Sequence, residues 1–436
     1  MPEAVYRMLT LLCAVVVNLP VGTNLGVLHL LWMLVSGRLL TSRGAVFPGL
    51  RACGLSRGAV RRAWAALGRG RWNSERLLVR WAALVAAEGQ WQAHTHEGVH
   101  PVAVDVTAFW RPRLRGCPTT HYCAEAGRAL PAIPVGIVAR VGEAGGQRVG
   151  LPLALVAAPA DEASPRAHLR ALVRAAVAQC AAEDVLVCDA GFPLALLHEE
   201  GATRVVVRLA TNATFRRATP PAYGGRGRPP TRGPLVRPLA RRYRGRVLAA
   251  TPPDSTVEWE EEGVRLRADL WRDVVLPTAG AASALPLTVV ALYDPRFRTP
   301  WLLATSCPLT PAALRALYRD RWPVEQLPLV AKQLLGAARQ FVHAPATCQR
   351  LPHLALLAGA VLAYAAATAP ALPTGFWDRR PRPTAGRLRR ALADCPFPTN
   401  FPLPASFRAK HAPTAHLRTG FWGQHHARTA SPPPAA

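Results

Sequence analysis

The chain has 436 residues, half of them hydrophobic, which allows two or three domains with substantial cores and excludes a disordered protein. It carries 53 Lys+Arg against 26 Asp+Glu, a formal net charge of +27, which predicts a polyanionic partner, with nucleic acid ahead of a membrane surface. Its nine cysteines are odd in number and lack a C-x-x-C pair. This pattern argues against a zinc ribbon and favours reduced thiols in a cytosolic protein.

Residues 1–92 are expected to form an all-helical, DNA-binding domain. The apolar runs near the N-terminus, among them a helix predicted over Val27–Leu40, are shorter than the roughly twenty residues of a membrane span, so we expect core helices and no membrane association. In the segment from Leu50 to Leu67, Gly54 predicts a turn and Ser56 a helix cap. The second helix would present Arg57 and Arg61 to DNA and turn Val60, Trp64 and Leu67 inward. This pattern resembles a helix-turn-helix unit, although an ordinary basic helix hairpin fits equally well.

Residues 98–210 have the pattern of an α/β unit. Apolar strands and one helix follow one another in the order Val102–Thr107, Ile133–Val141, Arg148–Val156, helix Ala167–Ala182, Val185–Asp189 and Val205–Leu209. With a second helix before the last strand, this is the order of the ribonuclease-H-like fold, a mixed sheet flanked by helices. We therefore expect a ribonuclease-H-like catalytic core to begin here.

The core is expected to be interrupted at residues 211–305 by a basic loop and a β-rich insertion. Arg216–Arg246 contains ten arginines, no acid and many Pro and Gly residues, and strands are predicted within Thr256–Leu276 and Pro286–Thr305. Residues 306–375 would complete the core with helices. Residues 376–436 read as a Pro/Arg-rich tail with one helix at Ala385–Ala393 and a disordered end.

Two aspartates lie towards the C-terminal ends of apolar strands of this predicted core. Asp105 and Asp189 would lie on adjacent strands of a ribonuclease-H-like sheet, and Glu325, on the helix after the insertion, would complete a cluster of three carboxylates. Such a cluster binds hard divalent ions. Two Mg²⁺ ions, for which Mn²⁺ can substitute, would activate an attacking oxygen and stabilise the leaving one in an in-line displacement.

A stripe of charged residues surrounds Glu325. Tyr318, Arg321, Glu325 and Lys332 are spaced by three, four and seven, so on one helix they would share a face. Lysine is rare in this chain, which has only Lys332 and Lys410, so its presence at the end of the stripe suggests a requirement for an ammonium group. A solvated face with ion pairs is the alternative reading.

These residues resemble the signature Y-x2-R-x3-E-x6-K of the DDE transposases of the insertion-sequence 4 family. The resemblance covers roughly residues 100–345. It implies that Asp105, Asp189 and Glu325 are the catalytic, metal-binding triad and that Tyr318, Arg321 and Lys332 contact DNA phosphates. Two tryptophans would also contact DNA: Trp322 completes the family's Arg-Trp pair, and Trp301 resembles an insertion-strand residue that stacks on a flipped base, unless it is a core aromatic.

Two prolines depart from a regular motif helix. Pro323 is compatible with a first turn, whereas Pro328 removes a backbone donor between Glu325 and Lys332 and predicts a bend.

The sequence therefore predicts a DNA transposase that binds the inverted-repeat ends of its element, cleaves them by metal-dependent hydrolysis and transfers the 3′-hydroxyl ends to target DNA. We expect a homodimer on double-stranded DNA in a bacterial cytoplasm, associated with the nucleoid. A catalytically decayed or repurposed DNA-binding protein of transposase origin is one alternative, and another ribonuclease-H-like nuclease is the second.

Overall fold

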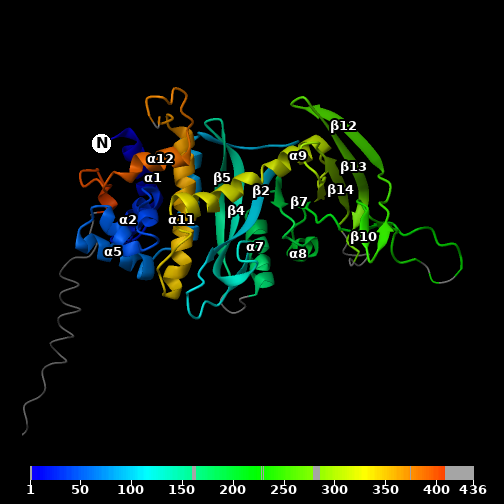
Figure 1. Ribbon diagram of the computed structural model, residues 1–436, viewed down its shortest axis with the longest axis horizontal. Coiled ribbons are helices and arrows are strands. Elements are labelled where there is room, and N and C mark those ends of the chain that lie inside the picture. Colours follow the sequence, from blue (N-terminus) through cyan, green and yellow to red (C-terminus); the bar gives the residue numbers. More distant parts are fainter. Residues whose placement is uncertain are drawn as a thin grey trace, which may run out of the picture.

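The computed structural model describes residues 2–159, 164–226, 228, 230–277, 285–373 and 375–407. The protein is a mixed α/β structure built on one large mixed sheet of 13 strands. Figure 1 shows helices α1, α2, α5 and α12 gathered at one end, strands β12–β14 at the other, and α11 between the helices and the middle of the sheet. The predicted disordered end, RTASPPPAA, lies outside the described residues.

Helices open the chain, recur between the central strands and dominate the part that follows β15 (Trp301–Thr305). The N-terminal helices are α1 (Glu3–Val16), α2 (Thr23–Val35), α3 (Arg38–Thr41), α4 (Val46–Ala52), α5 (Arg57–Arg69) and α6 (Ser74–Glu88). The others are α7 (Pro165–Gln179), α8 (Leu194–Glu199), α9 (Pro311–Arg319), α10 (Trp322–Leu329), α11 (Pro345–Thr368) and α12 (Ala385–Ala393).

The strands fall into a central group and a later group. The central strands are β1 (Trp91–Ala93), β2 (His100–Trp110), β3 (Thr120–Cys123), β4 (Arg128–Ala144), β5 (Gln147–Ala157), β6 (Asp184–Cys188) and β7 (Val205–Arg208). The later strands are β8 (Phe215–Arg217), β9 (Leu235–Val236), β10 (Arg241–Tyr243), β11 (Arg246–Leu248), β12 (Ser255–Glu261), β13 (Val264–Val275), β14 (Leu287–Tyr293) and β15 (Trp301–Thr305).

Pairing in the centre of the sheet runs β5-β4-β2-β6-β7. The β5–β4 and β4–β2 pairs are antiparallel, whereas β2–β6 and β6–β7 are parallel. Strands β15, β14, β13, β8 and β9 continue the sheet from β7, all antiparallel. The later strands therefore lengthen the central sheet and do not form a separate one.

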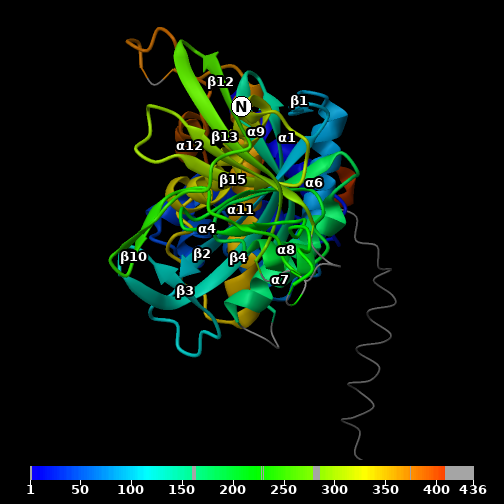
Figure 2. The same ribbon diagram turned by 90° about the vertical axis from the view of Figure 1, so that its right-hand side faces the viewer.

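Helices cover both faces of this sheet. Leu172 and Val173 of α7 pack with apolar strand residues of one face, whereas Leu314 and Leu317 of α9 pack on residues of the other. Figure 2, turned by 90°, shows α7 and α8 next to each other on one side of the central strands and α9 on the other. Helices α10 and α11 cover the same face of the sheet as α9 and share a hydrophobic core with the N-terminal helices.

Three local predictions need correction. The helix expected over Val27–Leu40 ends at Val35, because Gly37 adopts a left-handed conformation with φ 69° before the short α3 begins. Trp64 is 38% exposed and does not point inward, although Gly54 and Ser56 make the predicted turn and cap and Val60 and Leu67 are buried.

The third correction concerns Arg216–Arg246, which is not entirely a loop. Strands β8 and β9 extend the large sheet, and β10 and β11 form a separate hairpin. Phe215 and Val236 are 1% exposed, so the apolar residues flanking the arginines supply a core that composition alone does not reveal.

The long apolar helix α11 lies within residues 306–375, where helices were predicted. Among the described helices it is the one that is long and apolar enough to cross a membrane, and 83% of its most apolar stretch is buried inside the protein. The apolar segments near the N-terminus form α1 and α2, which have 14 and 13 residues.

Candidate active site

The first two predicted carboxylates lie on neighbouring parallel strands. Ala103 of β2 is in register with Val187 of β6, so Asp105 and Asp189, each two residues further along, lie side by side. Asp105 is within β2, which continues to Trp110, whereas Asp189 directly follows β6. Both line one cavity of about 290 Å³. The adjacency expected from the order of strands is thus present.

The predicted motif helix is not continuous, which corrects the single-stripe interpretation. Helix α9 ends at Arg319, α10 begins at Trp322, and a π-helical turn covers Val330–Leu334. Pro323 occupies the first turn of α10, where its missing N–H has no helical partner. Pro328 lies inside α10 just before the π turn, and its missing donor gives the physical reason for the irregular backbone there.

Despite this break, Arg321 links the carboxylates. Its guanidinium donates to Glu325, and its Nη1 lies 4.0 Å from Oδ1 of Asp105. Burial lowers the pKa of Arg321, but the charges of Tyr318, Glu325, Asp105 and Asp189 together leave that pKa raised. The guanidinium therefore stays charged and holds the two helical elements against β2.

Two buried donors in this region have no acceptor. Within the described residues, neither Oη of Tyr318 nor Nη1 of Arg321 has a hydrogen-bond partner. Tyr318 is 6% exposed, and its ring packs 5.6 Å from the ring of Trp301 and beneath the Arg321 guanidinium at 5.9 Å. Buried donors are normally satisfied, so this pair is suited to an incoming oxygen acceptor.

Lys332 is folded back onto β2. Its ammonium donates to Oγ1 of Thr107 at 2.7 Å and lies 4.9 Å from the Trp110 ring and 5.3 Å from the Phe109 ring. Burial lowers the pKa of Lys332 to about 8, against the opposing charge of Asp105. The π turn thus places the Lys332 ammonium against β2, the strand that carries Asp105.

The pKa of Asp105 responds to the other charged residues of the site. Burial raises the pKa of Asp105 to about 6; Arg321 opposes this rise, and the negative charges of Asp189 and Glu325 add to it. Three carboxylates therefore influence one another across the site. They are nevertheless less tightly grouped than a formed metal cluster, since Glu325 pairs with Arg321.

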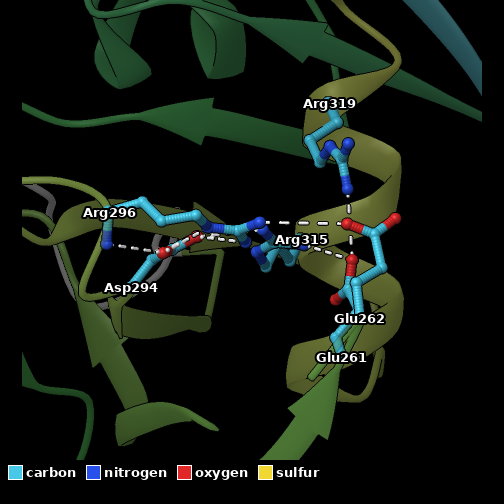
Figure 3. Close-up of polar contacts among 6 residues, drawn as sticks. All are labelled: Glu261, Glu262, Asp294, Arg296, Arg315 and Arg319. Atoms are coloured by element: carbon cyan, nitrogen blue, oxygen red, sulfur yellow. Dashed lines mark hydrogen bonds and ion pairs between the residues drawn. The ribbon is translucent and has the colours of Figure 1, made fainter. Parts of the chain in front are cut away.

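A network of ion pairs ties α9 to the later strands (Figure 3). Arg315, whose side chain is 4% exposed, donates to Glu261 at 2.5 Å and to Asp294 at 3.0 Å. Arg319 also reaches Glu261, at 3.1 Å, and Arg296 pairs with Asp294 at 2.8 Å. Bonds from Arg296 and Arg315 hold the pKa of Asp294 well below its usual range. Strands β12 and β14 therefore fix the helix that precedes Arg321.

The remaining predicted DNA contacts are not part of this centre. Trp322 is 58% exposed at the start of α10, and Arg57 and Arg61 are exposed on α5 among the N-terminal helices (Figure 1). Trp301 is half-buried and touches both Phe297 and Tyr318, so it is at present part of an aromatic cluster.

Sequence reasoning missed two histidines beside the carboxylates. His121 of β3 and His168 of α7 line the same cavity as Asp105 and Asp189. Burial lowers the pKa of both imidazoles, so they are neutral near pH 7. The signal was absent from the linear sequence, because only the β3–β4 pairing and the packing of α7 bring them there.

It also missed a group that could hold a metal ion. His94, His96 and Asp320 place three ligand atoms within 4.8 Å of one another, and in the described part of the chain no other trio of His, Cys, Asp or Glu does so. Asp320 is the last residue before Arg321, so this group adjoins the candidate active site. The nine cysteines are all unpaired in the structure.

Comparison with known proteins does not assign the chain. No protein-family model matches it, and no curated protein sequence is significantly similar to it.

Proposed function

We propose that the protein is a DNA transposase with a ribonuclease-H-like catalytic core. The observation that carries the proposal is the convergence on Asp105: Asp189 lies beside it on the next strand, Arg321 and Glu325 approach it from α10, and Lys332 approaches it from the π turn. Two acids on adjacent strands and one on a later helix, surrounded by cations, suit metal-dependent chemistry on a phosphodiester.

The strand order supports the same fold. The series β5-β4-β2-β6-β7, with three antiparallel strands followed by two parallel ones, is the arrangement expected of a ribonuclease-H-like core. In this proposal β8–β15 form the β-rich insertion and α9–α11 complete the core. The N-terminal helices, with Arg57 and Arg61 exposed, would bind the ends of the element.

The donor set fits Mg²⁺. Asp105, Asp189 and Glu325 supply hard carboxylate oxygens, and the raised pKa of Asp105 reflects the crowding of negative charge that a divalent cation would relieve. When bound, the ions would supply Lewis-acid activation of the attacking oxygen and charge stabilisation of the leaving oxygen. Mn²⁺ has similar ligand preferences and would substitute.

The protein's own residues would position the DNA. The unpartnered donors of Tyr318 and Arg321 suit the oxygens of the phosphate that is cut, and the Lys332 ammonium would contact a neighbouring phosphate. Trp322 is exposed and free to contact the strand, and Trp301 would stack on a flipped base if the Phe297 contact opens. The net charge of +27 would add salt-dependent affinity for double-stranded DNA.

The proposed reaction has two in-line displacements. Water attacks the phosphodiester at the element's end and releases a 3′-hydroxyl; that hydroxyl then attacks a target phosphodiester, forming a new P–O bond while the target's P–O3′ bond breaks. Two ends cut together would require a homodimer on DNA, in a bacterial cytoplasm and associated with the nucleoid.

Cleavage of the DNA that flanks the gene tests the proposal. Wild type should cut at the inverted repeats in Mg²⁺ and leave the DNA intact in EDTA, whereas Glu325→Gln should not cut. Equal cutting by wild type and Glu325→Gln would contradict the role of that carboxylate. Absence of cutting by a folded wild type that binds the repeats would favour a decayed, DNA-binding relic.

A further inference from the structure

A compact group of side chains surrounds Asp320, the residue that precedes Arg321 of the candidate active site. Nδ1 of His94 is 2.8 Å and Nε2 of His96 is 2.7 Å from the same oxygen, Oδ2 of Asp320. The Asp320 side chain is 1% exposed, and the two imidazoles are 20% and 18% exposed. Two imidazoles and one carboxylate thus converge on one point that solvent can reach from the histidine side.

The backbone of both histidines is fixed before any ligand binds. The N–H of His94 donates to the carbonyl of Val141 at 3.0 Å. His96 and Val99 exchange two backbone bonds, of 2.9 and 3.0 Å, across a tight turn in which Glu97 has φ 49° and Gly98 has φ 82°. The loop is therefore a rigid platform, and little conformational entropy would be lost on binding an ion.

The carboxylate is fixed just as firmly. Asp320 closes α9, where its N–H bonds to carbonyls of the last turn, and Nε of Arg148 lies 3.5 Å from its second oxygen, Oδ1. This contact leaves Oδ2 facing the imidazoles and is the type of outer contact that orients metal-ligating carboxylates.

The loop also grips the other end of α9. The carboxylate of Glu97 accepts hydrogen bonds from the N–H of Thr310 at 2.9 Å and from its hydroxyl at 2.5 Å, and Thr310 is the residue that caps α9. One loop thus contacts both ends of the helix that leads to Arg321.

We propose that His94, His96 and Asp320 form a second metal site, selective for a borderline divalent ion of the Zn²⁺ class, that braces the junction between α9 and α10. Nitrogen ligands favour such ions over Mg²⁺, and three protein ligands with a water in the fourth position make an open tetrahedral site. The site is independent of the proposed transposase activity.

The required movement is small. With metal–ligand bonds of about 2.0–2.1 Å in a tetrahedron, two ligand atoms lie about 3.3 Å apart, so each imidazole must move roughly half an ångström from Asp320. The two ring nitrogens, which lie within 4.8 Å of each other, must reach the same separation. The ion would displace the protons that now join the imidazoles to the carboxylate.

Zinc binding to the full chain tests the site. The chain has 13 histidines and nine cysteines, so the measured quantity is the difference in tightly bound Zn²⁺ between wild type and variants after equilibrium dialysis. Wild type should hold one more Zn²⁺ per chain than the double variant His94→Ala/His96→Ala, with affinity at the site reduced at least about 100-fold. His343→Ala, which removes an exposed histidine far along the chain from the group, should match wild type.

A second variant guards against misfolding. His96→Gln keeps an N–H donor for Asp320 but removes the imidazole, and its circular dichroism should match that of wild type. Zn²⁺ should raise the Tm of wild type and of His343→Ala but not of His96→Gln. Excess Mg²⁺ should not raise the Tm in place of Zn²⁺. Equal zinc stoichiometry and equal Tm shifts in wild type and His96→Gln would overturn the proposal.

Discussion

The two sides of the α9–α10 junction carry different chemistry only one residue apart. Arg321 faces Asp105 and Glu325, where all the candidate metal ligands are carboxylate oxygens. Asp320 faces His94 and His96, where two of three ligands are imidazole nitrogens. The side-chain atoms, and not proximity in the chain, therefore decide which ion each side can hold. We propose that the oxygen side binds Mg²⁺ for catalysis and that the nitrogen side binds Zn²⁺ and stabilises the junction.

The two sides also differ in how closely their candidate ligand atoms are already grouped. The His94–His96–Asp320 atoms are already gathered within 4.8 Å. On the other side, Glu325 is engaged by Arg321, and two donors lack acceptors. In our account the catalytic side is completed by DNA and metal together, and the nitrogen side by an ion alone.

The largest expected effect separates the two sides directly. Asp189→Asn should lower Mg²⁺-dependent end cleavage by about 10³-fold, because a neutral amide cannot replace an ion-binding carboxylate that stabilises charge in the transition state. The same variant should keep the Zn²⁺-dependent rise in Tm. Conversely, His94→Ala should cleave within about threefold of wild type in Mg²⁺. If either variant lost both DNA cleavage and the Zn²⁺-dependent rise in Tm, the two sides would not be independent.

A second experiment tests whether ion pairs from the later strands stabilise α9, the helix that leads to both Asp320 and Arg321. Arg315→Ala leaves Asp294 and Glu261 without their buried partner and should lower the free energy of unfolding by about 3 kcal/mol. Arg319→Ala removes a more exposed partner of the same Glu261 and should cost less than about 1 kcal/mol. Chemical denaturation measures both. Equal effects would show that burial at Arg315 does not matter.

Lys332 provides a pH test of the catalytic side. Its pKa is lowered from 10.5 to about 8, so the ammonium is charged at pH 7 and loses its charge as the pH rises past 8. DNA affinity should therefore fall by up to about tenfold between pH 7 and pH 9, as expected for the loss of one buried phosphate contact. Lys332→Arg, which stays charged, should lose this pH dependence. Fluorescence anisotropy at constant salt measures the effect, and an unchanged profile in Lys332→Arg would contradict it.

The smallest effect concerns the exposed arginines of α5, remote from both sides. The double variant Arg57→Gln/Arg61→Gln should weaken binding to end DNA about three- to tenfold and lower the salt dependence by about two phosphate contacts. Cleavage of bound DNA should be unchanged. A variant with wild-type affinity and salt slope would remove α5 from the DNA interface.

The sequence predicted most strands because their signals are local. It also placed Asp105 and Asp189 on neighbouring strands, although Asp105 lies in the middle of β2 and not towards its end. Apolar runs such as those around Asp105 and Asp189 identify buried strands, and the β2–β6 pairing followed from their order. Pro328 correctly predicted an irregular helix, although the break at Asp320 was not foreseen. The single-stripe interpretation failed because a face of one helix cannot be extended across a cap and a π turn.

The nitrogen side could not have been predicted from spacing alone. His94 and His96 are separated by one residue, which puts both imidazoles on the same side of an extended segment, and that was an available signal. Their partner Asp320 is 224 residues from His96 and is identified only when α9 packs on the sheet. His121 and His168 were missed for the same reason: tertiary packing alone brings them beside the acids.

Strand transfer is the direct test of the proposal that the protein is a DNA transposase that uses Glu325. DNA ending in the element's inverted repeat, with a free 3′-hydroxyl, is incubated with the protein, Mg²⁺ and a plasmid target, and covalently joined product is measured. Our account predicts joined product with wild type and with His96→Gln, and none with Glu325→Gln. Joining that is equal in wild type and Glu325→Gln, or absent from a wild type that binds these ends, would contradict it.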